Sequence, residues 1–249
     1  STLLASSAAS DVYKRQVRFS VNKIRKEKAE GRILEVLEKA PAEIQPSCPH
    51  FGECGGCTYQ NLPYEEQFRL KEQQVKAMMD EAVEGDYVWE GVLPSPVAFA
   101  YRNKMEFSFG DEYKDGPLAL GMHKRGSFHD IVNVENCQIV DEDYRKILTC
   151  TLEASKRSGL PYYHRMRHTG YFRHLLVRKA VKTGEILIDL VTTDGRDCGG
   201  EREITDYLEK WVDDLCRLSL DGKIAGILHT TNNSVADVVK DEGTETLYG

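Results

Sequence analysis

The stretch YFRHLLVRKAVKTGEILIDLVTT, residues 171 to 193, decides the fold class of this chain. Two runs rich in apolar and β-branched residues stand on either side of the short turn KTG, which contains a glycine. Two such runs around a tight turn are typical of a β-hairpin. The sequence therefore predicts two antiparallel strands here, and the flanking segments indicate what surrounds them.

Further strands are predicted on both sides of this hairpin. In YRNKMEFSFG, residues 101 to 110, apolar side chains alternate with polar ones, as in a half-buried strand. The turn DEYKDG follows, PLALGMHK returns as a second strand, and FHDIVNV is a third strand that leads to Cys137. Toward the C-terminus, IAGILHTTNNSVADVVK predicts another hairpin, which turns at Asn232 and Asn233.

Three segments predict helices. The segment PYEEQFRLKEQQVKAMMDEAV, residues 63 to 83, begins with a proline suited to a first helical turn. In residues 141 to 159, Asp141 is a candidate N-cap and Gly159 a candidate stop. In REITDYLEKWVDDLCRLS, the apolar residues fall on one helical face. Hairpins mixed with helices, without a regular alternation of strand and helix, predict an α+β fold with an antiparallel sheet and packed helices.

The composition is that of a globular protein without a membrane segment. Charged residues make up 29% of the 249 residues and hydrophobic residues 41%, which is ordinary for a folded domain. The sequence has no apolar run of the ~18 residues that a membrane span needs, and its first residues lack the pattern of a signal peptide. We expect a cytoplasmic protein, in which seven cysteines favour metal binding or catalysis over disulfides.

The charge is unevenly distributed along the chain. The formal net charge is −7, yet residues 151 to 180 contain seven Lys or Arg and a single acid, Glu153. Residues 185 to 249 contain fifteen acids and six Lys or Arg. This asymmetry allows a basic binding surface on an acidic protein. On charge alone, a solvated strand edge explains the basic segment equally well.

Three cysteines are clustered in CPHFGECGGC, residues 48 to 57. Cys48, Cys54 and Cys57 have the spacing C-x5-C-x2-C, and the three intervening glycines allow the backbone to turn tightly. Thiolate sets select zinc or iron–sulfur clusters, and the second short-spaced pair of a zinc knuckle is missing. The pattern indicates a metal site, with iron–sulfur favoured; the alternative is incidental thiols. Candidate fourth ligands are Cys137, which ends a strand and therefore leads, and Cys150, Cys198 and Cys216.

The segment CPHFGECGGCTYQNLPYEEQFRLKEQQV closely resembles the cluster motif of the RNA uracil-5-methyltransferases, in particular the cluster-bearing branch that methylates ribosomal RNA uridines. The resemblance continues through YRNKMEFSF, LGMHKRGSFHDIVNVENCQIVD, RHLLVRKAVKTGEILIDLVTT and ETLYG, and covers roughly residues 21 to 249. In that family, three clustered cysteines and one distant cysteine hold a [4Fe-4S] cluster. The resemblance implies that Cys48, Cys54, Cys57 and Cys137 are these ligands.

The resemblance also implies a domain organisation. The family has an N-terminal TRAM β-barrel, a central cluster-bearing domain and a C-terminal Rossmann-like domain that binds S-adenosylmethionine. We expect this chain to be a fragment that lacks most of the barrel and the whole methyltransferase domain, so that its catalytic residues lie beyond residue 249. The expected divisions are a non-native or disordered terminus (1–16), a barrel remnant and linker (17–46), the cysteine loop (47–62) and a central α+β RNA-recognition domain (63–249).

Basic and aromatic residues in the central part are candidates for RNA contacts. Phosphates attract Lys and Arg, and unstacked bases pack on aromatic rings. The alternative is the wet side of a strand. Since successive residues of a strand alternate between faces, Arg173 and Arg178 are not expected to share one. The candidates are Tyr101, Arg102, Lys104, Lys124, Arg125, Arg173 and Arg178.

Two other classes of function are compatible with the sequence. The chain could be a stand-alone iron–sulfur or zinc RNA-binding module without catalysis, or a redox protein that transfers electrons, which the basic segment does not favour. The expected partner is RNA, with ribosomal RNA favoured by the resemblance. The sequence indicates no obligate protein partner.

Overall fold

The computed structural model describes residues 15–25, 28–127, 129–235 and 241–249. The chain divides into two compact units, and each is described by itself. The smaller unit lies within Ser1–Ser47 and Tyr59–Pro96, and the larger unit comprises Cys48–Thr58 and Val97–Gly249. Residues 1–14 of the expected non-native terminus lie outside the described residues.

The smaller unit contains a β-ribbon and a helix. Strands β1 (Gln16–Arg25) and β2 (Lys28–Glu38) pair antiparallel in the segment predicted to be a barrel remnant. The predicted helix α2 (Tyr64–Ala82) starts after Pro63 and has no buried residue. The structure groups this helix with the ribbon, whereas the sequence-based division assigns it to the central domain.

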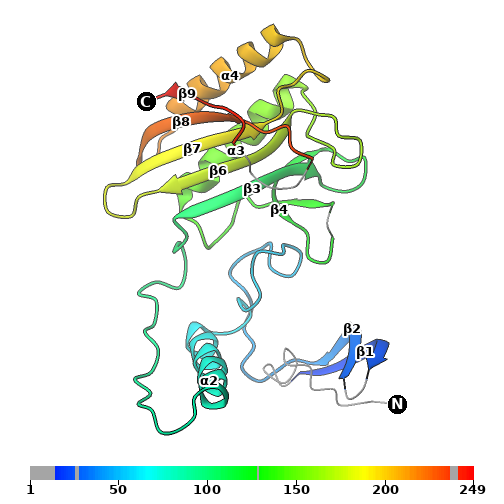
Figure 1. Cartoon of the computed structure of the whole chain (residues 1–249), viewed down its shortest axis with the longest axis vertical. Coiled ribbons are helices and arrows are strands. Elements are labelled where there is room, and N and C mark those ends of the chain that lie inside the picture. The colour runs from blue at the N-terminus through cyan, green and yellow to red at the C-terminus, as the bar shows by residue number, and fades with distance from the viewer. Residues whose placement is uncertain (1–14, 26–27, 128, 236–240) are drawn as a thin grey trace. The chain divides into compact units, whose positions relative to one another are not determined.

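The larger unit is built on a seven-stranded sheet with the order β5-β4-β3-β6-β7-β8-β9 (Figure 1). Its centre contains the hairpin predicted from residues 171 to 193, and β3 pairs antiparallel with β6 on the other side. The strands are β3 (Lys104–Asp111), β4 (Leu118–His123), β5 (Ile131–Asn133), β6 (Phe172–Lys179), β7 (Glu185–Thr192), β8 (Lys223–Thr231) and β9 (Thr244–Tyr248).

The prediction of an antiparallel sheet is wrong for one strand pair. Strands β7 and β8 run parallel, and helix α4 (Glu201–Cys216) connects them. Parallel neighbours need a long crossover connection, usually a helix, and α4 supplies it. The sheet is therefore mixed.

The second predicted hairpin also differs from the structure. Strand β8 ends at Thr231, and its antiparallel partner β9 begins at Thr244, well beyond the predicted turn at Asn232 and Asn233. Of the segment SVADVVK, which was predicted as the returning strand, residues 236–240 lie outside the described part of the chain.

One face of the sheet carries the core. Phe107 of β3 pairs with Leu175 of β6, and both side chains are completely buried. Helices α3 (Glu142–Ser158) and α4 contribute to the same core cluster through residues such as Ile147 and Trp211. The Trp211 indole also donates a hydrogen bond to the Thr151 hydroxyl (3.0 Å), which joins the two helices. The alternation and the apolar helix face expected from the sequence therefore build one core.

Helix α3 begins and ends at the predicted residues. The Asp141 side chain accepts hydrogen bonds from the backbone N–H groups of Asp143 and Tyr144, so it caps the first turn. Gly159 ends the helix with a φ of 72°, a left-handed conformation that glycine adopts without a Cβ penalty. Both local signals were sufficient without knowledge of the tertiary structure.

A buried carboxylate joins α3 to two other segments of the larger unit. Asp143 is 1% exposed and accepts hydrogen bonds from the Lys179 ammonium (2.7 Å) and from the N–H groups of Asp221 and Gly222 (2.8 Å each). Burial by itself would raise the pKa of Asp143, but these donors hold that pKa below its ordinary value. The helix start, the end of β6 and the turn before β8 thus meet at one ionised side chain.

Among the residues that the model describes, no helix combines the length and the apolar character needed to cross a lipid bilayer.

Candidate functional site

The four cysteines expected to bind a cluster line one pocket of about 180 Å³ in the larger unit. Cys48, Cys54 and Cys57 lie on the loop of residues 48–58, and Cys137 follows strand β5. Cys48 and Cys137 are each 8% exposed, and the other two are half-buried. Most of the remaining wall is apolar, formed by Phe51, Met105, Met122, Val134 and Ile139.

Short backbone hydrogen bonds shape the cysteine loop. The N–H of Phe51 donates to the Cys48 carbonyl (3.2 Å), and the N–H of Cys54 donates to the His50 carbonyl (2.9 Å). The N–H of Gly56 points at the Cys54 Sγ (3.3 Å). An N–H directed at sulfur favours the thiolate form, so the loop backbone provides one of the contacts that a thiolate ligand uses.

The buried position of these thiols opposes their ionisation. The pKa of Cys137 is raised to about 11, mainly by burial and in smaller part by the neighbouring Cys48 and Cys57. Burial also raises the pKa of Cys54, again with contributions from Cys57 and Cys48, although the Gly56 N–H partly offsets the shift. The electrostatic influence of the thiols on one another shows that they are close, and a cationic group among them would favour their thiolate forms.

Among the described residues, no set of three or more His, Cys, Asp or Glu side chains is arranged to hold a single metal ion. One tetrahedral zinc ion needs all its thiolates at about 2.3 Å from one point. The four cysteines thus line a common pocket without converging on a single ion.

The other three cysteines, all in the described part of the chain, do not line this pocket. Cys150 lies on α3 and Cys216 ends α4, as expected from the sequence. Cys198 lies between β7 and α4. Of the four candidates for a fourth ligand, the structure brings Cys137 to the three clustered cysteines.

Two of the predicted RNA-contact residues line the cysteine pocket as well. Arg102 is exposed, and Lys104 is half-buried with its ammonium 3.2 Å from the Glu106 carboxylate. Tyr101, which precedes them, is 50% exposed. Arg178 is exposed and lies opposite Lys104 in the register of β3 and β6, so these two cations occupy the same face of the sheet.

Lys124 and Arg125 lie on the turn between β4 and β5, beside the cysteine loop. The Lys124 ammonium is 3.0 Å from the Glu53 carboxylate, and the Arg125 guanidinium donates to the Cys57 carbonyl. The Arg125 N–H also donates to the Glu53 carbonyl (2.7 Å). Glu53 was not singled out from the sequence, because its role depends on a contact with a turn about 70 residues away.

Arg173 differs from the other candidates because it is 4% exposed. Its guanidinium donates to the carbonyls of Asn232 (3.1 Å) and Ser234 (2.7 Å) and lies 4.2 Å from the centre of the Tyr163 ring. It therefore faces protein groups and does not share the exposed face with Arg178.

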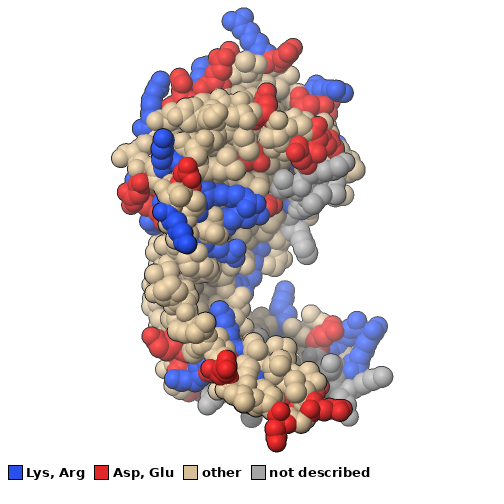
Figure 2. Space-filling model, turned by 60° about the vertical axis from the view of Figure 1, so that its left-hand side comes forward, with Lys and Arg blue, Asp and Glu red and all other residues tan. Residues whose placement is uncertain are grey.

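The basic loop of residues 160–170 lies beside the end of β4. The Arg165 guanidinium lies 3.4 Å from the His123 imidazole, so the loop of residues 160–170 contacts the end of β4. The only sequence signal for this loop was the basic segment of residues 151 to 180. Figure 2 shows several Lys and Arg side chains gathered near the middle of one face of the larger unit.

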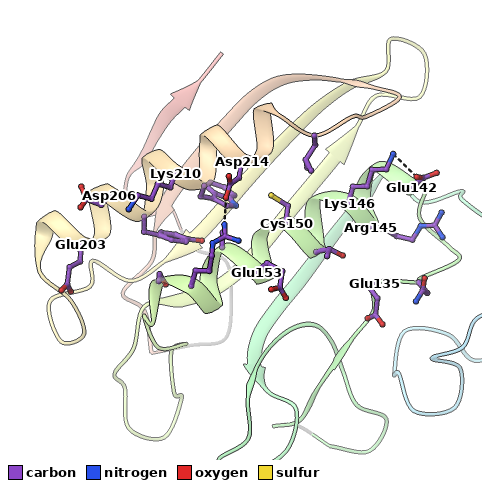
Figure 3. A pocket seen from close by; sticks show the side chains of 18 residues that line it. Glu135, Glu142, Arg145, Lys146, Cys150, Glu153, Glu203, Asp206, Lys210 and Asp214 are labelled. Atoms are coloured by element: carbon purple, nitrogen blue, oxygen red, sulfur yellow. Dashed lines mark hydrogen bonds and ion pairs between the residues drawn. The ribbon is translucent and has the colours of Figure 1, made fainter.

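A cavity of about 1390 Å³ lies between α3 and α4; it is lined by Cys150, but by none of the four clustered cysteines and none of the predicted RNA-contact residues. Figure 3 shows charged side chains from both helices around it, with Asp214 of α4 reaching toward α3. The Arg157–Asp214 pair (2.5 Å) spans the two helices, and Lys146 pairs with Glu142 (2.9 Å). The charges here largely neutralise one another, so the cavity does not present a uniform set of ligating or cationic groups.

Comparisons with known proteins identify relatives along nearly the whole chain. It is 42% identical to a protein of Caldanaerobacter subterraneus subsp. tengcongensis, over 94% of this chain and 50% of that protein. It is 45% identical to a protein of Clostridium acetobutylicum, over 92% of this chain and 48% of that protein. Both are named as uncharacterized RNA methyltransferases. The chain spans about half the length of the curated relatives it matches.

A solved structure shares the fold. It is a Pyrococcus abyssi tRNA (uracil-54, C5)-methyltransferase in complex with S-adenosyl-L-homocysteine, with a TM-score of 0.59 and 21% identity. The match covers 92% of this chain and 47% of that one. No family model matches the chain. The identity to the bacterial relatives carries the assignment: the chain belongs to the family of these RNA methyltransferases.

Proposed function

We propose that this chain is the cluster-holding, RNA-contacting part of an S-adenosylmethionine-dependent RNA uracil C5-methyltransferase. The RNA methyltransferase family is established by the bacterial relatives. Two observations support the finer assignment: the resemblance of the cysteine motif to the uracil-5 enzymes, and the fold shared with a tRNA uracil C5-methyltransferase.

The observation that carries this proposal is the meeting of four cysteines, from positions 48 to 137, in one pocket of one compact unit. Cys48, Cys54, Cys57 and Cys137 would hold a [4Fe-4S] cluster, whose iron ions take thiolate ligands. The pocket fits such a group because four thiols, two of them buried and two half-buried, line it together with apolar side chains such as Met105 and Val134. When bound, the cluster would link the loop covalently to the end of β5.

A mononuclear zinc site is less well supported by the same residues. The described cysteines do not converge on one point, as a single tetrahedral ion requires. A cubane cluster does not require the four thiols to converge on one point, because each thiolate binds a different iron. The stand-alone zinc module is for this reason the weaker alternative.

The proposed RNA surface consists of exposed or half-exposed side chains around this pocket. Phosphate contacts by Lys and Arg hold the RNA in place, and the ring of Tyr101 is exposed enough to stack on a base. Arg173 is assigned a supporting role, because its guanidinium binds backbone carbonyls of the chain. The surface comprises Tyr101, Arg102, Lys104, Lys124, Arg125 and Arg178.

The favoured substrate is ribosomal RNA, on the basis of the motif resemblance alone. A transfer RNA substrate is the competing assignment, since the solved structure is that of a tRNA (uracil-54, C5)-methyltransferase. Competition between a ribosomal RNA fragment and tRNA for the purified chain distinguishes them. Preferential binding of tRNA would reverse the assignment.

Metal analysis of anaerobically purified chain tests the cluster. We expect about four irons and four sulfides per chain and a broad brown absorption. One zinc without sulfide would refute the cluster and support the zinc module. A chain free of both metals would refute any metal role for these cysteines.

A methylation assay tests whether this chain alone transfers methyl groups. Since no residue of this chain is assigned as nucleophile for uracil C6 or as cofactor ligand, we expect the 249 residues alone to transfer no methyl group from S-adenosylmethionine to RNA. Formation of C5-methyluridine by the rigorously purified chain would show that the catalytic groups lie within it.

A further inference from the structure

The cysteine loop and the basic turn between β4 and β5 are joined by several contacts. The N–H of Gly55 donates to the His123 carbonyl (2.9 Å), and the N–H of Arg125 donates to the Glu53 carbonyl (2.7 Å). The side chains of Lys124 and Arg125 contact Glu53 and the Cys57 carbonyl, as described above. Loop and turn therefore form one connected structure.

We propose that the cysteine loop positions the cations of this turn, so that the affinity of the chain for an RNA phosphate backbone depends on a filled cysteine pocket. The proposal rests on the function proposed above, and it adds a specific coupling between the cysteine site and the RNA surface. It assigns to Glu53, Gly55 and His123 a positioning role that their sequence context does not reveal.

Close packing makes the position of the turn sensitive to the loop. A Cβ atom added at Gly55 would lie 2.9 Å from the His123 carbonyl oxygen, a distance that real Cβ atoms essentially never show. The His123 imidazole in turn lies 3.4 Å from the Arg165 guanidinium. A shift of the loop is thereby transmitted first to Lys124 and Arg125 and then toward Arg165.

The cysteine loop is irregular, rich in glycine and partly exposed. It contains no helix or named strand, three of its residues are glycines, and Gly52, Glu53, Gly55 and Gly56 are exposed. Glycine-rich segments lose much conformational entropy when they become ordered. Four metal–thiolate bonds would restrict that freedom. Without them, the loop's hydrogen bonds and its ion pair alone must offset the entropy lost on ordering.

The charges of the turn are available to a phosphate. The Lys124–Glu53 pair is exposed, with 41% and 58% of the two side chains accessible, and such pairs are weak in water. An RNA phosphate can therefore compete with Glu53 for the ammonium group. If Lys124 and Arg125 each contact one phosphate, together they contribute about 1.4 to the salt slope on single-stranded RNA, at ~0.7 per contact.

The first experiment compares the loaded and the iron-free chain. Binding of a fluorescein-labelled, uridine-containing single-stranded RNA is followed by anisotropy from 0.05 to about 1 M salt. We expect removal of iron to reduce the salt slope by about 1.4. With equal affinities of the two forms at 1 M salt, the iron-free chain then binds RNA about 25-fold more weakly than the loaded chain at 0.1 M salt. Adding Lys124→Ala and Arg125→Ala to the iron-free chain should cause little further loss.

The second experiment keeps the cysteines and disturbs only the junction. Gly55→Ala should displace the turn, weaken RNA binding severalfold and lower the salt slope, with iron content retained. Gly200→Ala is the matched control, because a Cβ at Gly200 meets no atom within 4 Å. Amide hydrogen exchange at Gly55 and Arg125 gives a direct readout, since both amides should exchange faster in the variant.

The outcomes separate this coupling from the proposed function. Equal RNA affinity of the loaded chain, the iron-free chain and Gly55→Ala would overturn the coupling and leave the cluster and the RNA surface intact. A wild-type chain without iron, or without RNA binding, would instead refute the proposed function. If the iron-free chain unfolds, Gly55→Ala decides: unchanged affinity with iron retained overturns the coupling.

Discussion

The cysteine pocket and the cavity between α3 and α4 belong to the same unit but differ in size and chemistry. The pocket measures about 180 Å³ and gathers four thiols among apolar side chains. The helix cavity measures about 1390 Å³, is lined by both acidic and basic side chains, and is spanned by the Arg157–Asp214 ion pair. Under the proposed function, the smaller pocket is the site, and it is marked by groups of one chemical type brought together from distant positions, not by its volume.

The largest expected difference between the two cavities is in the iron and sulfide content of their cysteine variants. Cys137→Ser should abolish cluster binding, because a serine hydroxyl is a poor ligand for iron compared with a thiolate. Cys150→Ser, in the helix cavity, should retain iron and sulfide. Both are read from iron and sulfide content and visible absorption. Loss of the cluster in Cys150→Ser and retention in Cys137→Ser would break the comparison.

The floor of the helix cavity should behave as core. Trp211 is completely buried and donates to Thr151, so Trp211→Ala should lower the free energy of unfolding by about 3–5 kcal/mol. Trp211→Phe should cost less, because it retains most of the packing and loses the hydrogen bond, worth about 1 kcal/mol. Urea denaturation measures both. A loss below about 1 kcal/mol for the alanine variant would argue that the cavity floor is not structural.

Cations at the two cavities should differ in their effect on RNA. Arg102→Ala and Lys124→Ala, near the cysteine pocket, should each weaken RNA binding and reduce the salt slope by about 0.7. Arg157→Ala at the helix cavity and Arg196→Ala, whose side chain is 85% exposed, should leave both nearly unchanged. Anisotropy titrations at several salt concentrations provide the measurement. Similar losses in all four variants would indicate a diffuse charge effect.

The smallest effect is expected from the ion pair that spans the helix cavity. Arg157 and Asp214 have side chains that are 61% and 32% exposed, so water screens their attraction. Arg157→Ala should lower the free energy of unfolding by at most about 1 kcal/mol. Thermal unfolding, with Arg196→Ala as control, tests this value. A cost of several kcal/mol would show that the pair holds the two helices together.

Local sequence signals predicted part of this molecule well. Asp141 and Gly159 define the ends of α3 through hydrogen bonds and backbone conformation within the same few residues, so no distant contact was needed. The alternation around Phe107 correctly predicted which side of β3 is buried. The central hairpin, β6 and β7, follows from a tight turn between two apolar runs.

Features that depend on tertiary structure could not be predicted from the sequence. The parallel pairing of β7 with β8 is set by the path of α4 over the sheet, and strand patterns alone do not encode direction. At Arg173 the register of β6 and β7 shifts, because Phe172 and His174 pair with the adjacent residues Thr192 and Val191. The burial of Arg173 was missed because the carbonyls that its guanidinium binds, those of Asn232 and Ser234, lie about 60 residues away in the sequence.

The sequence led us to expect the four cysteines to lie together, and they line one pocket; the residues that contact the cysteine loop were not predicted. The position of Cys137 at a strand end favoured it as a ligand, and the structure brings it to the cysteine loop. The link between Gly55 and His123 is a backbone contact between segments about 70 residues apart. Backbone contacts of this kind leave little trace in side-chain chemistry, so the sequence did not reveal them.

The buried carboxylate of Asp143 has a consequence for behaviour in acid. Its pKa is lowered in the folded chain, so its contribution to stability is complete above the pKa of an unfolded aspartate, about 3.9, and is lost as the pH falls through the folded value. Protonation would cancel the charge that attracts Lys179 and weaken the hydrogen bonds that the Asp143 carboxylate accepts from the N–H groups of Asp221 and Gly222. Acidification through the folded pKa of Asp143 should therefore weaken the contact between α3 and the turn before β8, which amide hydrogen exchange at Asp221 and Gly222 would detect.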